Sequence, residues 1–118
     1  MKIWNEVSDL FQIKRKNQIE VIAGDTGILN LNIDNYTFVD GDIVYFTVKK
    51  DISDTNYKFQ KVVKEFEDNV AIIKLSSKDT SLEAGEYLYD IQLSLKDGRV
   101  DTVVSPTLFE VVDGVTND

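Results

Sequence analysis

Apolar and polar residues alternate with a period of two along most of the chain. In "ILNLNID", residues 28–34, the apolar residues Leu29, Leu31 and Ile33 alternate with asparagine and aspartate. Successive side chains of a strand point to opposite faces of its sheet, so this pattern is typical of a strand with one buried and one solvated face. No long segment has the apolar stripe of an amphipathic helix. The pattern therefore predicts an all-β protein.

Similar alternation marks the other segments that we expect to be strands. These segments are residues 17–22, 43–50, 57–66, 70–75, 86–95 and 100–112. We expect "NQIEVI" to pair with residues 28–34 across the "AGDTG" turn, and residues 57–66 to form a hairpin with residues 70–75. We also expect "KDGR", residues 96–99, to close a hairpin between residues 86–95 and 100–112, because Asp-Gly tolerates the positive φ angles of a type I′ turn. About seven strands with turn residues between them are typical of an immunoglobulin-like antiparallel β-sandwich.

Three local features interrupt the regular pattern. Adjacent Val62 and Val63 break the alternation, which predicts a bulge or an edge strand. Pro106 has no backbone N–H to donate, so the last strand should lie at an edge or bend there. Ser76 or Ser77 is expected to cap a single helical turn, because a serine side chain accepts a hydrogen bond from the first turn of a helix.

The chain of 118 residues has the length of one domain with one core. We predict an N-terminal arm at residues 1–15, a sandwich at residues 16–113 and a flexible tail at residues 114–118. The arm contains Trp4, in "KIWNEV", and we expect it to dock on its own sandwich or on a neighbouring molecule.

The segment "SLEAGEYLYDIQL" is predicted to hold the sandwich together. Gly85 and Tyr87 at the start of a strand have the spacing of a tyrosine corner, in which the phenol hydroxyl donates to a backbone carbonyl a few residues upstream. Antibody domains carry a cysteine two residues after this tyrosine, whereas this chain has Tyr89. Aromatic packing therefore replaces the disulfide in our interpretation.

Composition removes most catalytic chemistries from consideration. The chain has no cysteine and no histidine, so it lacks the thiolate nucleophile, the commonest general base and the commonest zinc ligand. We therefore predict that the protein is not an enzyme and has no cofactor. Glu6 and Asp9 interrupt the region where a signal peptide would need an apolar core, and no run is long enough to span a bilayer.

The charge balance argues against nucleic acid as a partner. Thirteen basic and 21 acidic residues give a net charge of -8, which is the wrong sign for contact with phosphates. The single basic cluster, Lys14 to Lys16, has no aromatic residues within it, and we interpret it as solvated surface.

Two sets of side chains remain as candidate binding residues. Asp34, Asp40 and Asp42 could offer oxygen ligands to calcium, but they lack the spacing of an EF-hand loop, and turn chemistry explains them more simply. The second set combines aromatic rings with a possible polar end, which suits contact with a protein partner or a sugar. Its members are Trp4, Tyr36, Tyr45 and Tyr57.

Several short segments between residues 16 and 112 form a recognisable series. They are Gly24 to Thr26, Phe46 to Lys50, Asp79-Thr80 with Gly85 and Tyr87, Tyr89 to Leu93, Asp97-Gly98, and Phe109 to Val111. In these segments the chain resembles the amino-terminal domain of siphovirus baseplate upper proteins and related small phage or prophage tail-associated proteins. The chain departs from the pattern at Ala84, where the family usually has proline, and in its tryptophan-bearing arm.

The resemblance implies a non-enzymatic virion structural protein that is assembled in the host cytoplasm. Such domains attach fibre or receptor-binding components to a tail baseplate through contacts with other virion proteins, including copies of themselves. Because the sequence continues only a few residues past the last expected strand, we expect a small standalone tail protein. The alternative is a β-sandwich that recognises a cell-surface carbohydrate through its exposed aromatic residues.

Overall fold

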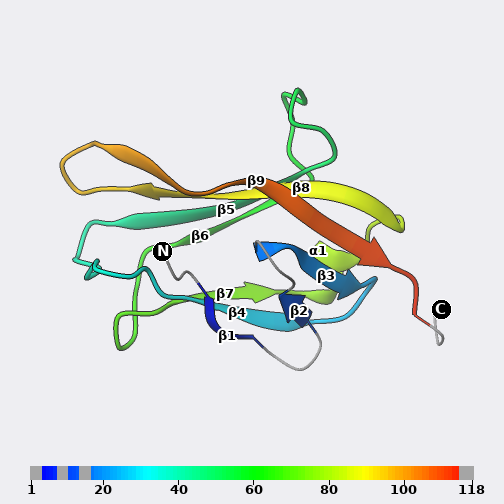
Figure 1. Ribbon diagram of the computed structural model, residues 1–118, viewed down its shortest axis with the longest axis horizontal. Helices are drawn as coiled ribbons and strands as arrows, with labels where there is room; N and C mark the ends of the chain where they lie inside the picture. The colour runs from blue at the N-terminus through cyan, green and yellow to red at the C-terminus, as the bar shows by residue number, and fades with distance from the viewer. Residues whose placement is uncertain (1–3, 8–10, 14–16, 115–118) are drawn as a thin grey trace.

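The computed structural model describes the backbone of residues 4–7, 11–13 and 17–114, and the side chains of residues 17–114. The strands are β1 (Trp4–Val7), β2 (Phe11–Ile13), β3 (Ile19–Ile22), β4 (Gly27–Leu31), β5 (Ile43–Lys49), β6 (Phe59–Val63), β7 (Ala71–Leu75), β8 (Gly85–Ser94) and β9 (Val100–Val112), and one helical turn is α1 (Ser77–Thr80). Two sheets lie face to face (Figure 1). The all-β sandwich is confirmed.

The strand order differs from the simple hairpins that the sequence suggested. One sheet has the order β1-β4-β7, and the other has the order β2-β3-β9-β8-β5-β6. β3 and β4 therefore lie in different sheets, as do β6 and β7, and these two expected hairpins are wrong. The hairpin expected at residues 96–99 is confirmed between β8 and β9. β3 pairs in parallel with β9, while the other pairs are antiparallel. Each short turn carries the chain across to the facing sheet, which lets the two apolar faces cover each other.

The segment expected to be an arm contributes a strand to each sheet. Trp4 in β1 pairs with Leu31 of β4, and Phe11 in β2 pairs with Val21 of β3. The side chain of Trp4, the cluster Lys14 to Lys16 and residues 115–118 of the expected tail lie outside the described residues.

Aromatic side chains from four strands, β5, β6, β8 and β9, meet in the core. The ring of Phe46 stacks on Tyr89 with centroids 5.1 Å apart and meets Phe109 edge-on at 6.2 Å. Phe59 also packs edge-on against Phe109 at 6.0 Å. Each fully buried aromatic or aliphatic side chain stabilises the fold by about 1.5–3 kcal/mol relative to an exposed one. All four rings come from strands of the six-stranded sheet and form an aromatic cluster on its buried face.

Pro106 lies where β9 is irregular. Tyr89 pairs with Thr107 and Ile91 with Val104, so β9 has one residue more than β8 across this step. Val104 and Phe109 are both buried although they are five positions apart, and this odd spacing requires such a bulge because only evenly spaced residues of a regular strand share a face. β3 pairs with β9 only from Phe109 onward. The proline therefore occupies a bulged part of the strand beyond the parallel pairing, as its missing N–H predicted.

An ion pair joins the edge strand β6 to α1. β6 is the terminal strand of the described six-stranded sheet, as the break in alternation predicted. Lys61 stands opposite Phe46 in the register and so faces inward, where its ammonium lies 2.6 Å from the carboxylate of Asp79. An inward-pointing charge at a sheet edge discourages pairing with another chain.

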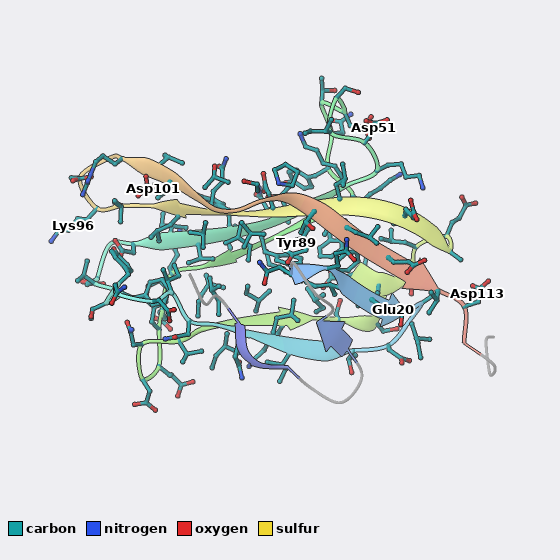
Figure 2. The ribbon with its side chains drawn as sticks, in the orientation of Figure 1. Glu20, Asp51, Tyr89, Lys96, Asp101 and Asp113 are labelled. Atoms are coloured by element: carbon teal, nitrogen blue, oxygen red, sulfur yellow. The ribbon has the colours of Figure 1, made fainter. Side chains whose placement is uncertain are left out.

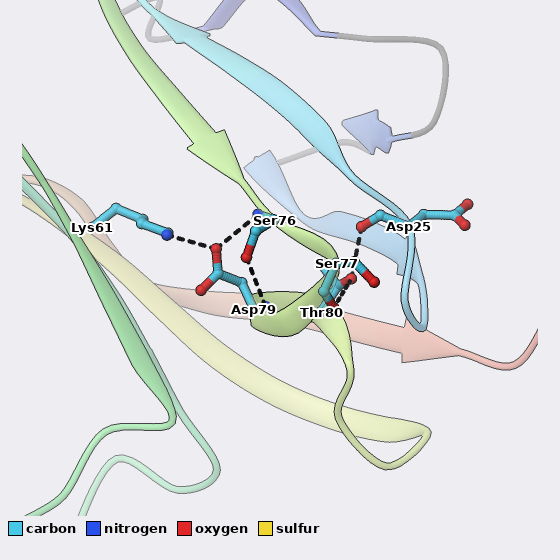
Figure 3. A network of polar contacts seen from close by, with 6 residues as sticks. All are labelled: Asp25, Lys61, Ser76, Ser77, Asp79 and Thr80. Atoms are coloured by element: carbon cyan, nitrogen blue, oxygen red, sulfur yellow. Dashed lines mark hydrogen bonds and ion pairs between the residues drawn. The ribbon is translucent and has the colours of Figure 1, made fainter.

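Asp79 belongs to a compact network around α1 (Figure 3). Its carboxylate accepts the Ser76 N–H at 2.8 Å, and the Ser76 hydroxyl accepts the Asp79 N–H at 3.2 Å, which is a capping box at the predicted cap. The buried Thr80 hydroxyl donates to the carbonyl of Asp25 at 2.7 Å and thereby ties α1 to the β3–β4 turn. These contacts fix the connection from β7 to β8.

The next residues form the hydrogen bond of a tyrosine corner. The hydroxyl of Tyr87, whose side chain is buried, donates to the carbonyl of Glu83 at 2.8 Å. Gly85 begins β8 with φ of +154°, a conformation that other residues rarely adopt. The hydroxyl of Tyr89 donates to the carbonyl of Asn17, which anchors the segment before β3. Tyr87 thus closes the turn that leads into β8, and Tyr89 connects β8 to backbone that is distant in the sequence.

Candidate functional site

Three loops gather at one end of the sandwich. They are residues 32–42 between β4 and β5, residues 64–70 between β6 and β7, and residues 95–99 between β8 and β9 (Figure 1). We call these three segments the loop end. Loops carried by a rigid sandwich are frequent positions for binding residues, because they can vary while the sheets hold them in place.

A buried carboxylate organises the first of these loops. The hydroxyl of Tyr36 donates to Oδ2 of Asp42 at 2.6 Å, and the backbone N–H of Val39 donates to the same oxygen at 3.0 Å. The N–H of Asp42 donates in return to the carbonyl of Val39 at 3.1 Å. Asp42 is only 1% exposed. The carboxylate therefore fixes both the turn and the orientation of the tyrosine ring.

Asn69 joins the first loop to the second. Its side-chain oxygen accepts the N–H of Phe38 at 2.7 Å, and its side-chain nitrogen donates to the carbonyl of Tyr36 at 3.0 Å. The ring of Phe38 also stacks on Phe66 with centroids 4.2 Å apart. A side chain that satisfies two backbone groups of a neighbouring loop restricts the motion of both loops, so this part of the loop end is pre-organised.

A pocket of about 480 Å³ opens between the first loop and the β8–β9 hairpin. Its volume lies within the range of small-ligand sites. Its lining residues are Tyr36, Val39, Asp42, Leu95, Lys96, Asp97 and Arg99. Arg99 and Asp97 form an exposed ion pair at 2.9 Å on the hairpin. Lys96 extends from the tip of the same hairpin (Figure 2). The pocket thus combines apolar walls with a charged rim.

The electrostatic field of the loop end is negative. Its segments contain seven acidic and three basic residues, a net charge of -4 that is half of the protein's -8. Burial, the hydrogen bond to Asp42 and the charge of that carboxylate together raise the pKa of Tyr36 to about 12, and Arg99 opposes them only in part. Tyr36 is consequently a protonated hydrogen-bond donor at neutral pH.

One atom of this site is left without a contact. Oδ1 of Asp42 is buried and has no hydrogen-bond partner within residues 17–114. An unpaired acceptor out of contact with water costs free energy, and a buried carboxylate oxygen costs more than a neutral one. Buried polar atoms of this kind are uncommon in folded proteins, and a ligand is one of their explanations.

The structure separates the candidate contact residues of the sequence. Tyr36 is at the loop end, Tyr45 is half-buried on the outer face of β5, and Tyr57 is exposed on the loop between β5 and β6. The three rings do not form one surface site, because their positions lie on different parts of the six-stranded sheet and its loops. Trp4 pairs through its backbone with β4.

The aspartates of the weak calcium prediction also have separate environments. Asp40 is exposed, whereas Asp42 is buried beneath the pocket. Over the described ranges, no three acidic side chains come together in a group that could hold a metal ion. Likewise, no helix in the described part of the chain is long and apolar enough to cross a membrane.

A smaller cleft lies on the outer face of the six-stranded sheet. It has a volume of about 60 Å³ and includes Lys49, Ile52, Asp90 and Pro106 in its lining. Burial raises the pKa of Asp90, and the charge of Lys49 opposes this shift. The cleft has room for only one or two water molecules. The larger pocket at the loop end is therefore the stronger candidate for a binding site.

Sequence reasoning identified Tyr36 and Asp42 separately but missed their hydrogen bond, and it missed Asn69 altogether. The Asp40-Gly41-Asp42 run and the Asn69 turn were the available signals. Comparisons of the chain with protein-family models, with curated proteins and with solved structures found no match.

Proposed function

We propose that this protein is a non-enzymatic module of a phage or prophage virion that serves tail or baseplate assembly through protein–protein contacts. The observation that carries the proposal is the pocket at the loop end, whose walls are held by Asp42 and Asn69. Pre-organised surfaces of this kind bind without a large loss of conformational entropy.

The chemistry of the pocket suits recognition better than catalysis. An acid or base that works near neutral pH needs a pKa near that pH. Tyr36, with a pKa of about 12, holds its proton, and its hydroxyl already donates to Asp42. The carboxylate in turn accepts two hydrogen bonds from its own loop. This pair therefore maintains the shape of a surface.

The virion setting is supported by the sequence motifs. The segments from Phe46 to Lys50 and from Asp79 to Gly98 resemble those of siphovirus baseplate and tail-associated proteins. In the structure these segments form β5 and the connection through α1 to β8, which is the frame that carries the loop end.

The proposal is tested by purifying phage particles after induction of a host strain that carries the gene. Particles are separated on a density gradient, and peptides of the chain are quantified by mass spectrometry. We expect the chain to copurify with tails at a fixed copy number. Absence from the particles, despite expression in the cell, would overturn the virion role.

A pair of matched variants locates the contact surface. Val39 is 50% exposed beside the pocket, and Ile28 is 40% exposed on the three-stranded sheet. We expect Val39→Asp to reduce incorporation into particles and Ile28→Asp to leave it unchanged. Equal incorporation of both variants, each shown to be folded by circular dichroism, would place the contact elsewhere on the molecule.

A further inference from the structure

The loop-end pocket presents two kinds of surface to a ligand. Val39, Leu95 and the ring of Tyr36 supply apolar wall, and Asp42 supplies a carboxylate beneath it. Oδ2 of that carboxylate is already used by Tyr36 and Val39, whereas Oδ1 is buried without a partner in the described structure. A ligand that fits both features needs an apolar stem and a hydrogen-bond donor at its end.

We infer that this pocket receives a lysine or arginine side chain presented by a protein partner, whose cationic head group is bound by Asp42. This inference rests on the proposed function, because it names the chemistry of the partner at the same site. Lysine and arginine carry aliphatic stems that pack on apolar surface and head groups that only donate hydrogen bonds. A buried carboxylate oxygen is the matching acceptor.

The charge of the loop end favours a cation over a neutral sugar. The net charge of -4 in its three segments attracts a basic partner and raises the rate of encounter. Tyr36 is also poorly placed to serve as a sugar platform, because its side chain is partly buried and its hydroxyl is bonded to Asp42. The basic residues of the rim are partly compensated, since Arg99 is paired with Asp97.

Lys96 is the lining residue that we expect to move when the partner's side chain enters the pocket. Gly41 has φ of +104°, and a Cβ atom at this position would lie only 3.0 Å from Cγ of Lys96. The stem of Lys96 thus rests on the backbone beside Asp42, where only glycine leaves room for it. The side chain of Lys96 is exposed, so an incoming cation can displace it and reach Oδ1 of Asp42. The partner's side chain then takes the place of the aliphatic stem of Lys96.

The test is an NMR titration of the full chain with three small probes. The probes are Nα-acetyl-lysine N-methylamide, Nα-acetyl-arginine N-methylamide and Nα-acetyl-norleucine N-methylamide, the last of which keeps the lysine stem without the ammonium. We expect the two cationic probes to shift the amide signals of residues 36–42 and 95–99, and norleucine to bind about tenfold more weakly. Equal binding of lysine and norleucine probes would overturn the inference.

A matched pair of variants tests the role of the carboxylate. Asp42→Asn keeps an oxygen for Tyr36 and Val39 but places a donor where Oδ1 was, and Asp40→Asn removes the same charge from an exposed position outside the pocket lining. We expect Asp42→Asn to weaken lysine-probe binding about tenfold and Asp40→Asn to change it less than about twofold. Similar losses in both variants would reduce the effect to general charge and overturn the site.

A third variant keeps the test decisive if Asp42→Asn does not fold. Lys96→Ala alters only an exposed side chain, and we expect it to raise the affinity of the lysine probe because a like charge and a movable wall are removed. Unchanged or weaker binding contradicts the inference. If methyl glycosides compete with the lysine probe, the sugar alternative gains support instead. These outcomes are independent of the particle experiment, so failure of the pocket and failure of the virion role are told apart.

Discussion

Two tyrosines hold the two ends of the sandwich, and their hydroxyls have different acceptors. Tyr87 donates to the neutral carbonyl of Glu83 at 2.8 Å, whereas Tyr36 donates to the carboxylate of Asp42 at 2.6 Å. The acceptor of Tyr87 is a backbone carbonyl, which is present whatever side chain the residue carries. A buried carboxylate needs compensation for the loss of its hydration, and the local structure must supply it.

The carboxylates of Asp79 and Asp42 differ in how completely their hydrogen-bonding capacity is satisfied. In α1, the carboxylate of Asp79 is paired with Lys61 and accepts the Ser76 N–H. At the loop end, Oδ1 of Asp42 remains unpaired among residues 17–114. The contacts of Asp79 are thus supplied within the fold, while Asp42 at the loop end can accept one more hydrogen bond. This difference is the structural basis for placing function at the loop end.

The largest effect on this comparison is expected when the loop-end carboxylate is deleted. Asp42→Ala leaves both the Tyr36 hydroxyl and the Val39 N–H without an acceptor, and we expect it to lower the free energy of unfolding by about 3 kcal/mol. Asp42→Asn keeps one acceptor oxygen and removes a buried charge, so it should cost less than about 1 kcal/mol. Urea unfolding followed by circular dichroism measures both values. Equal losses would show that the charge itself stabilises the turn.

Removal of the two hydroxyls compares the ends directly. We expect Tyr36→Phe to lower the free energy of unfolding by about 2 kcal/mol, because it takes a donor from a buried carboxylate, and Tyr87→Phe by about 1 kcal/mol, because its lost acceptor is neutral. The same unfolding assay ranks the variants. A greater loss at Tyr87 would reverse the order and contradict the importance given to the carboxylate.

The buried faces of the strands could be predicted from the sequence because alternation reports which side of a sheet a residue occupies. Val44, Phe46 and Val48 are all fully buried on the face that the pattern of residues 43–50 assigned to the core. The pattern carries no information on which strand lies beside which. Two expected hairpins failed for this reason, since "AGDTG" and the turn at Asn69 reverse the chain while moving it to the other sheet, whereas the turn at residues 96–99 keeps both of its strands in one sheet.

The candidate site was predictable only in part, because it is made in a loop without a repeating pattern. The sequence drew attention to Tyr36 as an aromatic contact and to Asp42 as a turn residue. Their hydrogen bond depends on how residues 32–42 fold back, and that path is held by Asn69 from another loop. Contacts between loops far apart in the sequence follow from tertiary packing, which local spacing does not encode.

The dependence of the free energy of unfolding on acidic pH should show the contribution of the Asp79 carboxylate in α1. Burial alone would raise the pKa of Asp79, but hydrogen bonds from Lys61 and Ser76 outweigh it and lower the pKa below its ordinary value of 3.8. A carboxyl whose pKa is lowered by folding stabilises the protein above pH 3.8 and loses this contribution as the pH falls through its folded-state pKa. We expect Asp79→Asn to cost about 1 kcal/mol near neutral pH and progressively less below pH 3.8.

Asp90 provides the control with the opposite sign. Burial raises its pKa above 3.8, so its contribution to stability is present below that pH and is lost as the pH rises through the folded-state pKa. Asp90→Asn should therefore be neutral or slightly stabilising at neutral pH. Urea midpoints measured between pH 3 and pH 7 for both variants check the two signs. If the urea midpoints of Asp79→Asn and wild type change in parallel with pH, the ion pair with Lys61 does not contribute to stability in solution.

The smallest effect on stability is expected at Asp97, where the same change should nevertheless alter binding. Its ion pair with Arg99 is exposed, and exposed pairs contribute little to folding. We expect no measurable change in the urea midpoint of Asp97→Asn. The lysine probe should bind more weakly to this variant, because Arg99 is released from its carboxylate and repels a cation in the adjoining pocket. Unchanged binding would mean that the charges of Asp97 and Arg99 do not affect the affinity of the lysine probe. Recognition would then depend on Asp42 and the apolar lining residues alone.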